Sequence, residues 1–408
     1  MEYQSSEALM RADALAEYCT RWTPAPRVEY VPLDQAFGRV LARDLVGQCN
    51  LPVVRASKFD GFAVHAEDFA QGLPCTDDWI AGVDYAPADT GDDFPDAFDA
   101  VIAVESTRRD ENGQLRIVPD GKFDARPGAG VSPCGSISRA GERIAPAHLR
   151  LTPEAVAAAA VGGYAQVPVL ARPRVAFIPT GTELVPWGSY PRRGQNIEAN
   201  SLLVQGLVQE WGGEALVYPL VRDDRESVAA ALERALEAAD IVVLNAGSSR
   251  GGDDFNADLL AGRASWFRHG VKAVPGRPVG MALIDNKPVV NAPGPVLAAW
   301  LCMDWLVRGL VAHWFGTPVI DQQRITVRLG ATVEDAKQRE RIVRVQLAPA
   351  ADGVPVAMPI GKMGVPQTLV QVDALFTLPA HQEVAREGDL VEVELLRPLE
   401  LVREGWAN

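Results

Sequence analysis

The sequence lacks the features that would assign it to a disulfide-rich, zinc-binding or membrane-spanning class. Its five cysteines (Cys19, Cys49, Cys75, Cys134 and Cys302) form no CxxC pair, and none of its five histidines lies in an HExxH arrangement. No apolar run approaches the roughly 20 residues that cross a bilayer, and the first residues lack the basic and apolar segments of a signal peptide. We therefore predict a cytoplasmic protein with reduced, mostly structural thiols and no membrane contact.

Basic residues are also fewer than acidic ones, and the acidic excess is unevenly distributed along the chain. The formal net charge is −14, and residues 1–112 hold 21 acidic side chains against 9 basic ones, so most of the excess lies there. Six acidic residues fall between Asp84 and Asp99. A chain of this charge is a poor partner for nucleic acid. We interpret the acidic cluster as a solvated surface.

The chain is long enough for two to four domains, because 408 residues exceed what one hydrophobic core supports. Amphipathic spacing predicts a helix over 6–21, and short alternating stretches over about 60–140 predict a small β-rich domain. From Arg172 to about 311, strands and helices alternate regularly, which predicts a doubly wound α/β domain with a mostly parallel sheet. Beyond Pro318 the pattern is strand-like again and predicts a C-terminal β domain.

Three loops of the predicted α/β domain follow strands: Pro179–Glu183, Asn245–Asp254 and Ala292–Pro295. Because ligands in doubly wound sheets lie beyond the carboxyl ends of the strands, we expect these loops to face one crevice. In the second loop, small residues and the hydroxyls of Ser248 and Ser249 suit an anion, and Asp253 and Asp254 suit a cation or a hydrogen-bond donor. A plain strand-to-helix turn with an Asp N-cap remains the alternative.

Further motifs run along nearly the whole chain. They are PLDQAFGRVLA at 32–42, SKFDGFAV at 57–64, Thr90-Gly91 before AVI at 100–102 and Glu105, PTGTEL at 179–184, Asn200-Ser201, Arg222–Asp224, NAGSSRGGDDF at 245–255, HGVKAVPGRP at 269–278 and NAPGPV at 291–296. In this order they resemble the molybdenum insertase family, the MoeA and gephyrin E-domain type of molybdopterin molybdenumtransferase. That family's patterns include SAMDGYAV, STGDEL, SGGxSxGxxDY, HGVAxKPGKP and GLPGNPVS.

The resemblance implies an elongated homodimer of four-part chains, with the pterin site between the α/β domain of one chain and the C-terminal domain of the other. The parts are a discontinuous base (1–52 and 141–170), an inserted β-rich domain (53–140), the α/β molybdopterin-binding domain (171–317) and a C-terminal β domain (318–408). The implied reaction inserts molybdate, or tungstate in some relatives, into adenylylated molybdopterin with Mg²⁺ assistance and releases molybdenum cofactor and AMP. Implied partners are a molybdopterin adenylyltransferase and molybdoenzyme apoproteins or their chaperones.

The same resemblance assigns site residues. Glu183, Asp60 and Asp254 are the expected catalytic residues, and Glu183, Asp224 and Asp254 the expected metal ligands. Residues expected to bind the pterin or its phosphates are Thr90, Thr180, Gly181, Asn200, Ser201, Asp224, Gly247, Ser248, Ser249, Gly251, Lys272, Pro275, Gly276, Arg277 and Gly294. Taken alone, Asp224 and Asp254 could instead cap a helix, and Asp60 could be an ordinary turn residue.

The chain also departs from the family pattern. Ile137 stands where the family has the functional Asp of a GED motif, Val274 replaces the first Lys of KPGKP, Thr182 replaces the Asp of GDEL, and the Asn and Ser of GNPVS are absent. We therefore keep two hypotheses open: an active molybdopterin molybdenumtransferase, and a non-catalytic homologue that binds molybdopterin or cofactor or scaffolds partners. A single-domain adenylyltransferase fits less well because of the flanking domains.

Overall fold

The computed structural model of the chain describes residues 8–118, 124–245, 255–319, 322–361 and 364–398. The fold divides into two compact units. One contains residues 28–170, and the other contains the described residues before and after that segment. The domain division predicted from the sequence places residues 1–27 in the base domain, whereas the structure packs residues 8–27 with the unit that contains the α/β domain.

The side chain of Tyr18 explains this difference. Tyr18 is buried on helix α1 (Arg11–Arg21). Its hydroxyl donates to the carbonyl of Val289 at 2.6 Å and accepts from the backbone N–H of Ala282 at 2.9 Å. Because those two residues pair across neighbouring strands, the tyrosine fixes α1 to the central sheet.

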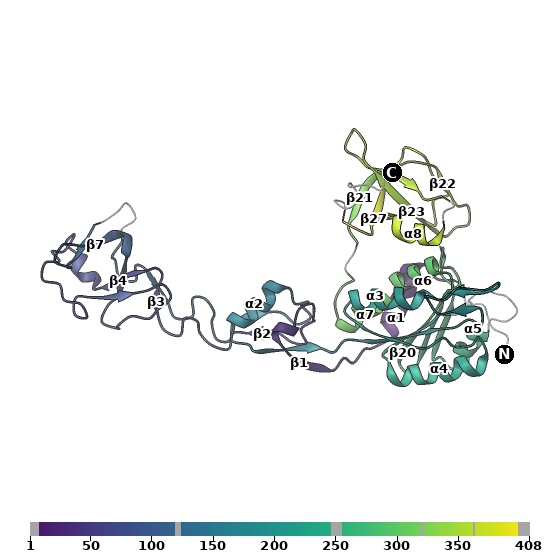
Figure 1. Cartoon of the computed structure of the whole chain (residues 1–408), viewed down its shortest axis with the longest axis horizontal. Coiled ribbons are helices and arrows are strands. Elements are labelled where there is room, and N and C mark those ends of the chain that lie inside the picture. The colour runs from purple at the N-terminus through teal and green to yellow at the C-terminus, as the bar shows by residue number, and fades with distance from the viewer. Residues whose placement is uncertain (1–7, 119–123, 246–254, 320–321, 362–363, 399–408) are drawn as a thin grey trace. The chain divides into compact units, whose positions relative to one another are not determined.

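A six-stranded sheet forms the centre of the α/β domain (Figure 1). In spatial order its strands are β15 (Glu214–Val217), β12 (Arg174–Pro179), β16 (Ile241–Asn245), β20 (Lys287–Ala292), β19 (Gly280–Ile284) and β17 (Trp266–His269). The first four strands are parallel, and β19 and β17 run antiparallel to their neighbours. The predicted parallel strands are confirmed, while β17 and β19 were not predicted.

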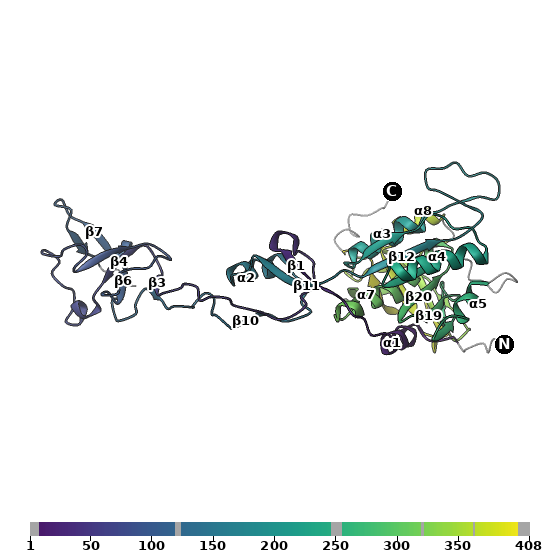
Figure 2. The same cartoon turned by 90° about the horizontal axis from the view of Figure 1, so that it is seen from below.

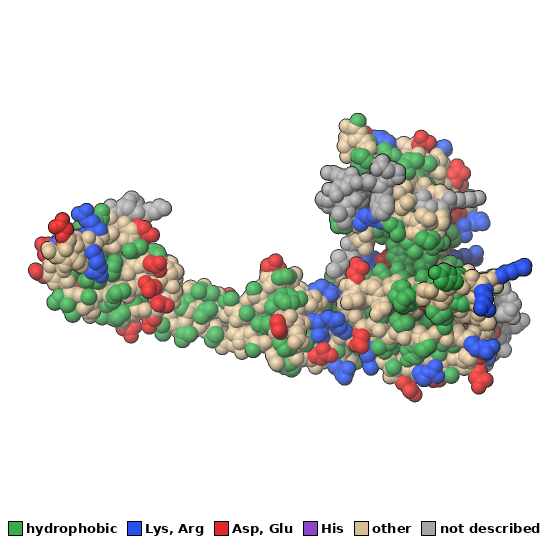
Figure 3. Space-filling view, viewed as in Figure 1, with side chains coloured by type: hydrophobic (Ala, Val, Ile, Leu, Met, Phe, Trp, Pro, Cys, Tyr) green, Lys and Arg blue, Asp and Glu red, His purple; other side chains and the backbone are tan. Residues whose placement is uncertain are grey.

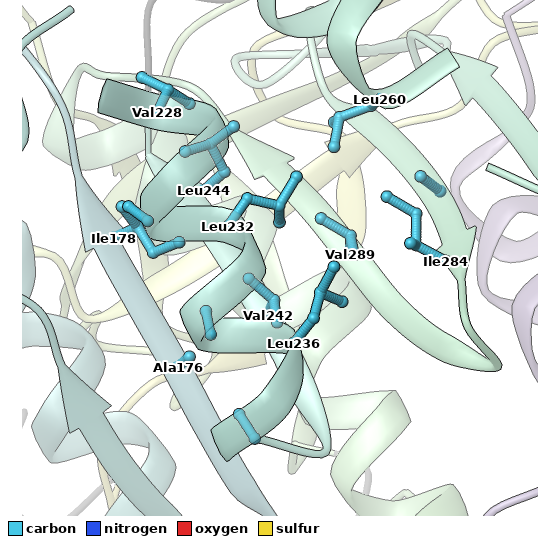
Figure 4. Packing of buried hydrophobic residues seen from close by; sticks show 14 residues of the cluster. Ala176, Ile178, Val228, Leu232, Leu236, Val242, Leu244, Leu260, Ile284 and Val289 are labelled. Carbon is cyan, nitrogen blue, oxygen red and sulfur yellow. The ribbon is translucent and has the colours of Figure 1, made fainter. Parts of the chain in front are cut away.

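Helices cover both faces of this sheet, as expected for a doubly wound domain (Figures 1 and 2). Helices α4 (Arg225–Ala238) and α5 (Phe255–Ala261) cover one face. On that face Leu232 and Leu260 join a buried cluster with Ile178, Leu244 and Val289 (Figure 4). The other face carries α1, α3 (Asn200–Glu210), α6 (Val296–Cys302) and α7 (Arg308–Phe315).

Helices α6 and α7 are continuous through a π-helical turn, Met303–Val307. Among the described residues, this 20-residue run is the one helix with the length and mean hydropathy (1.3) of a membrane span. Its most apolar window is 61% buried inside the protein, as expected for the core helix of a domain.

The C-terminal domain is a small closed barrel. Strand β23 (Glu340–Ala348) pairs with both β24 (Val356–Pro359) and β25 (Ala374–Leu378). The circle closes through β21 (Arg324–Leu329) and β27 (Leu390–Leu395). The remaining elements are β18 (Ala273–Val274), which pairs with the start of β23, the short pair β22 (Val333–Glu334) and β26 (Val384–Ala385), and α8 (Val365–Gln371).

The unit of residues 28–170 contains two small β regions. The first has β1 (Val28–Pro32) paired with β11 (Gln166–Leu170), β2 (Leu45–Val46) paired with β10 (Arg143–Ala145), and α2 (Pro153–Val161). The second has β3 (Ala56–Ser57) with β9 (Val131–Ser132), β4 (Gly61–Val64) between β5 (Tyr85–Ala88) and β6 (Ala100–Ala103), and β7 (Thr107–Arg109) with β8 (Leu115–Ile117).

Of the six acidic residues from Asp84 to Asp99, all but Asp84 are exposed, and acidic side chains gather over this region in Figure 3. The interpretation as a solvated surface is confirmed.

Candidate functional site

The described parts of the predicted ligand loops lie along one edge of the central sheet. The pairing registers place Ile178, Leu244, Asn291, Gly280 and His269 in one row across five strands. Strands β12, β16, β20 and β17 end at this row or one residue beyond it, and β19 begins in it. The segments 180–183, 293–295 and 270–279 therefore lie at the same edge, and an isolated bridge between Thr180 and Val221 adds the segment 221–224.

The buried side chain of Asn245 ties this edge together. Its amide nitrogen donates to the carbonyls of Pro293 (2.8 Å) and Ala292 (3.3 Å), and its amide oxygen accepts from the side chain of Asn200 at 2.8 Å. Asn200 also donates to the carbonyl of Gly294 at 2.8 Å. Only a carboxamide supplies donors and an acceptor at once in this way. Two asparagines thus join the ends of β16 and β20 to the start of α3.

The backbone of Asn245 also holds the first ligand loop. Its carbonyl accepts from the N–H of Thr180 at 2.9 Å and from the Thr180 hydroxyl at 3.2 Å. Thr180 is therefore committed to the scaffold through both groups. Asn245 is not among the site residues predicted from the sequence. The available signal was a polar side chain that ends an otherwise aliphatic strand.

The turn after Thr180 presents unused backbone donors. Within the described structure, the N–H groups of Thr182 and Glu183 donate to no acceptor. Neighbouring free N–H groups in a turn are suited to an anion such as phosphate. A Cβ on Gly181 would lie 3.0 Å from Oε2 of Glu183 and 2.8 Å from Leu184, so the carboxylate of Glu183 folds back over the glycine. Glu183 is exposed, and its carboxylate has no hydrogen-bond or ion-pair partner among the described residues.

Asp224 and Ser201 both take part in helix capping. Asp224 is the N-cap of α4, with its carboxylate accepting from the N–H of Ser227 at 2.8 Å and from the Ser227 hydroxyl at 2.9 Å. These bonds, the backbone one first, lower the pKa of Asp224. The N–H of Ser201 donates to the buried carboxylate of Glu198 at 2.9 Å. The capping alternative raised for Asp224 is confirmed, and a ligand role for Ser201 stays a prediction.

The loop after β17 is closed by backbone hydrogen bonds and carries two positively charged side chains. The N–H groups of Val271 and Val279 both donate to the carbonyl of Arg277 at 3.0 Å, which closes the loop on itself. Gly276 has a φ of +105°, and a Cβ there would lie 2.8 Å from the indole of Trp305. Glycine is therefore required at this position. Lys272 is half-buried and Arg277 exposed on this loop, and the predicted Pro275 lies between them.

Two further predicted residues meet in the unit of residues 28–170. The Asp60 carboxylate accepts from the backbone N–H of Thr90 at 2.8 Å and from its hydroxyl at 2.7 Å. These bonds, the backbone one first, lower the pKa of Asp60, so the carboxylate is ionised at neutral pH. Gly61 is required beside it, because a Cβ there would lie 1.9 Å from the carbonyl oxygen of Ile102. The pair Asp60–Thr90 is thus a preformed, exposed anionic feature.

The remaining predicted residues Gly247, Ser248, Ser249, Gly251 and Asp254 lie outside the described residues. Among the residues that are described, no group of three His, Cys, Asp or Glu side chains could hold a metal ion. The described residues would thus supply few ligands to a metal at this edge. That is ordinary for Mg²⁺, which usually keeps several waters and is bound by one or two carboxylates together with substrate phosphates.

Ile137 is the residue that the resemblance predicts to stand in place of an acid. Ile137 is 67% exposed and lines a cavity of about 390 Å³ in the unit of residues 28–170. Ser136, Arg139, Glu142 and Arg143 line the same cavity. The replacement of an acid by isoleucine therefore leaves an accessible surface and not a filled core position.

Together these features define a multidomain protein with a doubly wound α/β domain that presents a ligand-binding edge. In the sequence, this domain follows an N-terminal β region and precedes a C-terminal barrel. Three family models match the chain in this order. Residues 6–163 match the MoeA N-terminal region (domain I and II), 176–313 a probable molybdopterin binding domain, and 326–396 the MoeA C-terminal region (domain IV). The chain belongs to the MoeA family.

Individual relatives agree with this assignment. The chain is 31% identical over 311 residues to "Molybdopterin molybdenumtransferase 2" of Mycobacterium tuberculosis H37Rv, which covers 71% of this chain and 75% of the relative. It is 25% identical over 385 residues to the molybdopterin molybdenumtransferase of Staphylococcus aureus strain COL, covering 90% of each. The crystal structure of a molybdopterin biosynthesis MoeA protein from Pyrococcus horikoshii matches with a TM-score of 0.80 and 27% identity, covering 96% of this chain and 100% of that one.

Proposed function

We propose that this protein is a molybdopterin molybdenumtransferase, which takes adenylylated molybdopterin and molybdate and releases molybdenum cofactor and AMP. The observation that carries this proposal is the edge at which Asn245 and Asn200 join the loops after β12, β16 and β20. A scaffold built this firmly around free backbone donors is suited to a phosphorylated ligand. The relatives from M. tuberculosis and S. aureus bear the name of this activity.

The chemistry of the residues at this edge suits them to different roles. The N–H groups of Thr182 and Glu183 can donate to phosphate oxygens, and Lys272 and Arg277 can neutralise the charge of the phosphates or of molybdate. The Glu183 carboxylate, exposed and without a partner among the described residues, can accept a proton or contact a cation. The side chains of Thr180, Asn200 and Asn245 hold the geometry, because the Thr180 hydroxyl, the Asn200 amide nitrogen and both polar atoms of the Asn245 amide are already bonded within the protein.

We further propose that Mg²⁺ takes part in the reaction and that, among the described residues, Glu183 is its ligand. When bound, Mg²⁺ would neutralise charge that develops on the departing phosphate. Asp224 is a weaker candidate than the sequence analysis expected, because hydrogen bonds to Ser227 engage both of its carboxylate oxygens. Tungstate is an alternative oxyanion, and a competition experiment with molybdate would distinguish the two.

A homodimer with a shared site is also part of the proposal. Asp60 and Thr90 form a polar pair in the unit of residues 28–170, whereas the strand-end edge belongs to the other unit. Large apolar side chains of the first unit are exposed, among them Tyr30, Phe37 and Val53. Such side chains favour association with a second copy. Light scattering of the purified protein should give twice the chain mass, and the mass of one chain would contradict the dimer.

The partner proteins and the cellular location that we propose follow from the substrates. A molybdopterin adenylyltransferase would supply the adenylylated pterin, and molybdoenzyme apoproteins or their chaperones would receive the product. We propose a cytoplasmic location without membrane contact, where these partners meet. The net charge of −14 and pI near 4.9 argue against nucleic acid as a further partner.

The alternative is a non-catalytic homologue that binds molybdopterin or cofactor, or scaffolds other proteins. The exposed Ile137, which stands where the family has a functional acid, favours this alternative. The experiment supplies purified protein with adenylylated molybdopterin and molybdate, with and without Mg²⁺, and measures AMP together with reconstitution of an apo-molybdoenzyme. AMP release that depends on molybdate supports the enzyme. Tight ligand binding without AMP or active cofactor would select the non-catalytic homologue.

A further inference from the structure

The three residues before α1, together with its first residue Arg11, hold the positively charged loop from one side. We call residues 8–11 the N-terminal strap. Leu9 donates its N–H to the carbonyl of Gly270 at 3.3 Å, and its carbonyl accepts from the N–H of Lys272 at 2.7 Å. These bonds form an isolated parallel bridge between Leu9 and Val271. The backbone around Lys272 is therefore fixed by a segment more than 260 positions away in sequence.

The barrel holds the same loop from the other side. The N–H of Glu340, the first residue of β23, donates to the carbonyl of Lys272 at 2.9 Å. Ala273 and Val274 then pair with Glu340 and Arg341 as β18. Lys272 thus donates its backbone N–H to the strap and accepts with its carbonyl from the barrel.

The side chain of Arg11 joins these two supports. Its Nε lies 2.9 Å from Oε2 of Glu340, and both side chains are largely shielded, with 22% and 17% of their surface exposed. The guanidinium also lies over the indole of Trp305, 5.2 Å from the ring centroid. That ring is the surface on which Gly276 packs without room for a side chain. Arg11 therefore contacts both residues that fix the two ends of the loop, Glu340 beside Lys272 and Trp305 beside Gly276.

We propose that Arg11 is a positioning residue for substrate binding: it holds the loop 270–277 so that Lys272 and Arg277 face the anionic groups of the substrate. This inference rests on the proposed function, because the substrate is the adenylylated pterin named there. An ordinary surface ion pair contributes little and fixes no geometry. This pair differs because it is shielded, because its arginine also stacks on an aromatic ring, and because it links the strap, the barrel and the helix that carries Trp305.

Hydrogen–deuterium exchange tests the positioning directly and needs no substrate. In an Arg11→Met variant, the amides of residues 270–277 should exchange about ten-fold faster or more, while those of β12 and β16 should be unchanged. Arg11→Lys keeps the charge beside Glu340 but loses the planar contact with Trp305, so its exchange should be intermediate. Unchanged exchange at residues 270–277 in Arg11→Met would overturn the inference, whether or not the protein is an enzyme.

Substrate kinetics test the consequence. For Arg11→Met we expect the KM for adenylylated molybdopterin to rise about ten-fold with kcat within about two-fold of the wild type, because the loop binds and orients the substrate without reacting. Arg11→Lys should recover part of the loss. The control is Arg397→Met, which removes a similarly shielded ion pair to Asp373 (25% and 8% exposed) elsewhere in the C-terminal domain, together with hydrogen bonds to the carbonyls of Val370 and Val372.

The control should lower the melting temperature without changing KM. An equal rise of KM in Arg397→Met would show that general loosening of the barrel is responsible, and would contradict a specific role of Arg11. If the wild type binds the pterin compound but releases no AMP, the proposed activity fails. The inference on Arg11 is then decided by the dissociation constant, measured by pterin fluorescence, which should rise by the same factor.

Discussion

Replacement of Asn245 by alanine is the sharpest test of how the strand-end edge is built. The change removes the 2.8 Å bond to the carbonyl of Pro293 and the 2.8 Å bond from Asn200, together with a longer and weaker bond to Ala292. The side chain is 2% exposed, so these groups lose their partners without access to bulk water. A buried polar group without a partner costs about 1–3 kcal/mol. With two groups strongly affected, we expect the free energy of unfolding to fall by about 2–4 kcal/mol.

Urea unfolding measures this loss, and two further variants make it specific. Asn196→Ala removes an exposed amide that makes no side-chain hydrogen bond in the described structure, and should change stability by less than about 0.5 kcal/mol. Asn245→Asp keeps the shape but cannot donate to Pro293 while ionised. Its buried carboxyl should have a raised pKa, so its stability should be greatest at low pH and fall as pH rises through that pKa. A loss below about 0.5 kcal/mol in Asn245→Ala would refute the reasoning.

The other predictions concern separate parts of the chain. Tyr18→Phe should cost about 1–3 kcal/mol in urea unfolding, because the N–H of Ala282 loses its buried acceptor; a neutral result would show that α1 is held by packing alone. Thr90→Val should raise the pKa of Asp60 toward its ordinary value without abolishing the shift, because the backbone bond remains, and carboxyl NMR titration would detect this. Ile137→Asp should give no large gain in AMP release, because Ser136 has also replaced the adjoining acid; a large gain would contradict this.

The regular part of the fold was predictable because its signals are local. Strands β12, β16 and β20 are buried runs of aliphatic residues, and α4 shows helical spacing after an Asp N-cap. Strand β17 is not predictable from its sequence, because Trp266–His269 is only four residues long and places two aromatic residues before two basic ones, without the alternation typical of a strand. The closure of the barrel through β23 was also beyond prediction, since it depends on pairings between distant segments.

The site shows the same division between local and distant information. The sequence identified Thr180, Asn200 and Gly294 by their motifs, and the structure brings all three to one edge. It did not identify Asn245 as the residue that joins them, because its partners Ala292, Pro293 and Asn200 lie far away along the chain. The assignment of residues 1–27 to the base differed for a similar reason, because Tyr18 reaches the sheet through two backbone contacts that no local pattern reveals.

Molybdate-dependent AMP release by Glu183→Gln tests whether the strand-end edge of the α/β domain carries out the transfer. Glutamine keeps the size of the side chain but removes the charge that could accept a proton or contact a cation. We predict that the rate falls by about 100-fold or more, with the oligomeric mass and melting temperature unchanged. A variant that releases AMP at the wild-type rate would remove Glu183 from the mechanism and contradict this assignment of the active site.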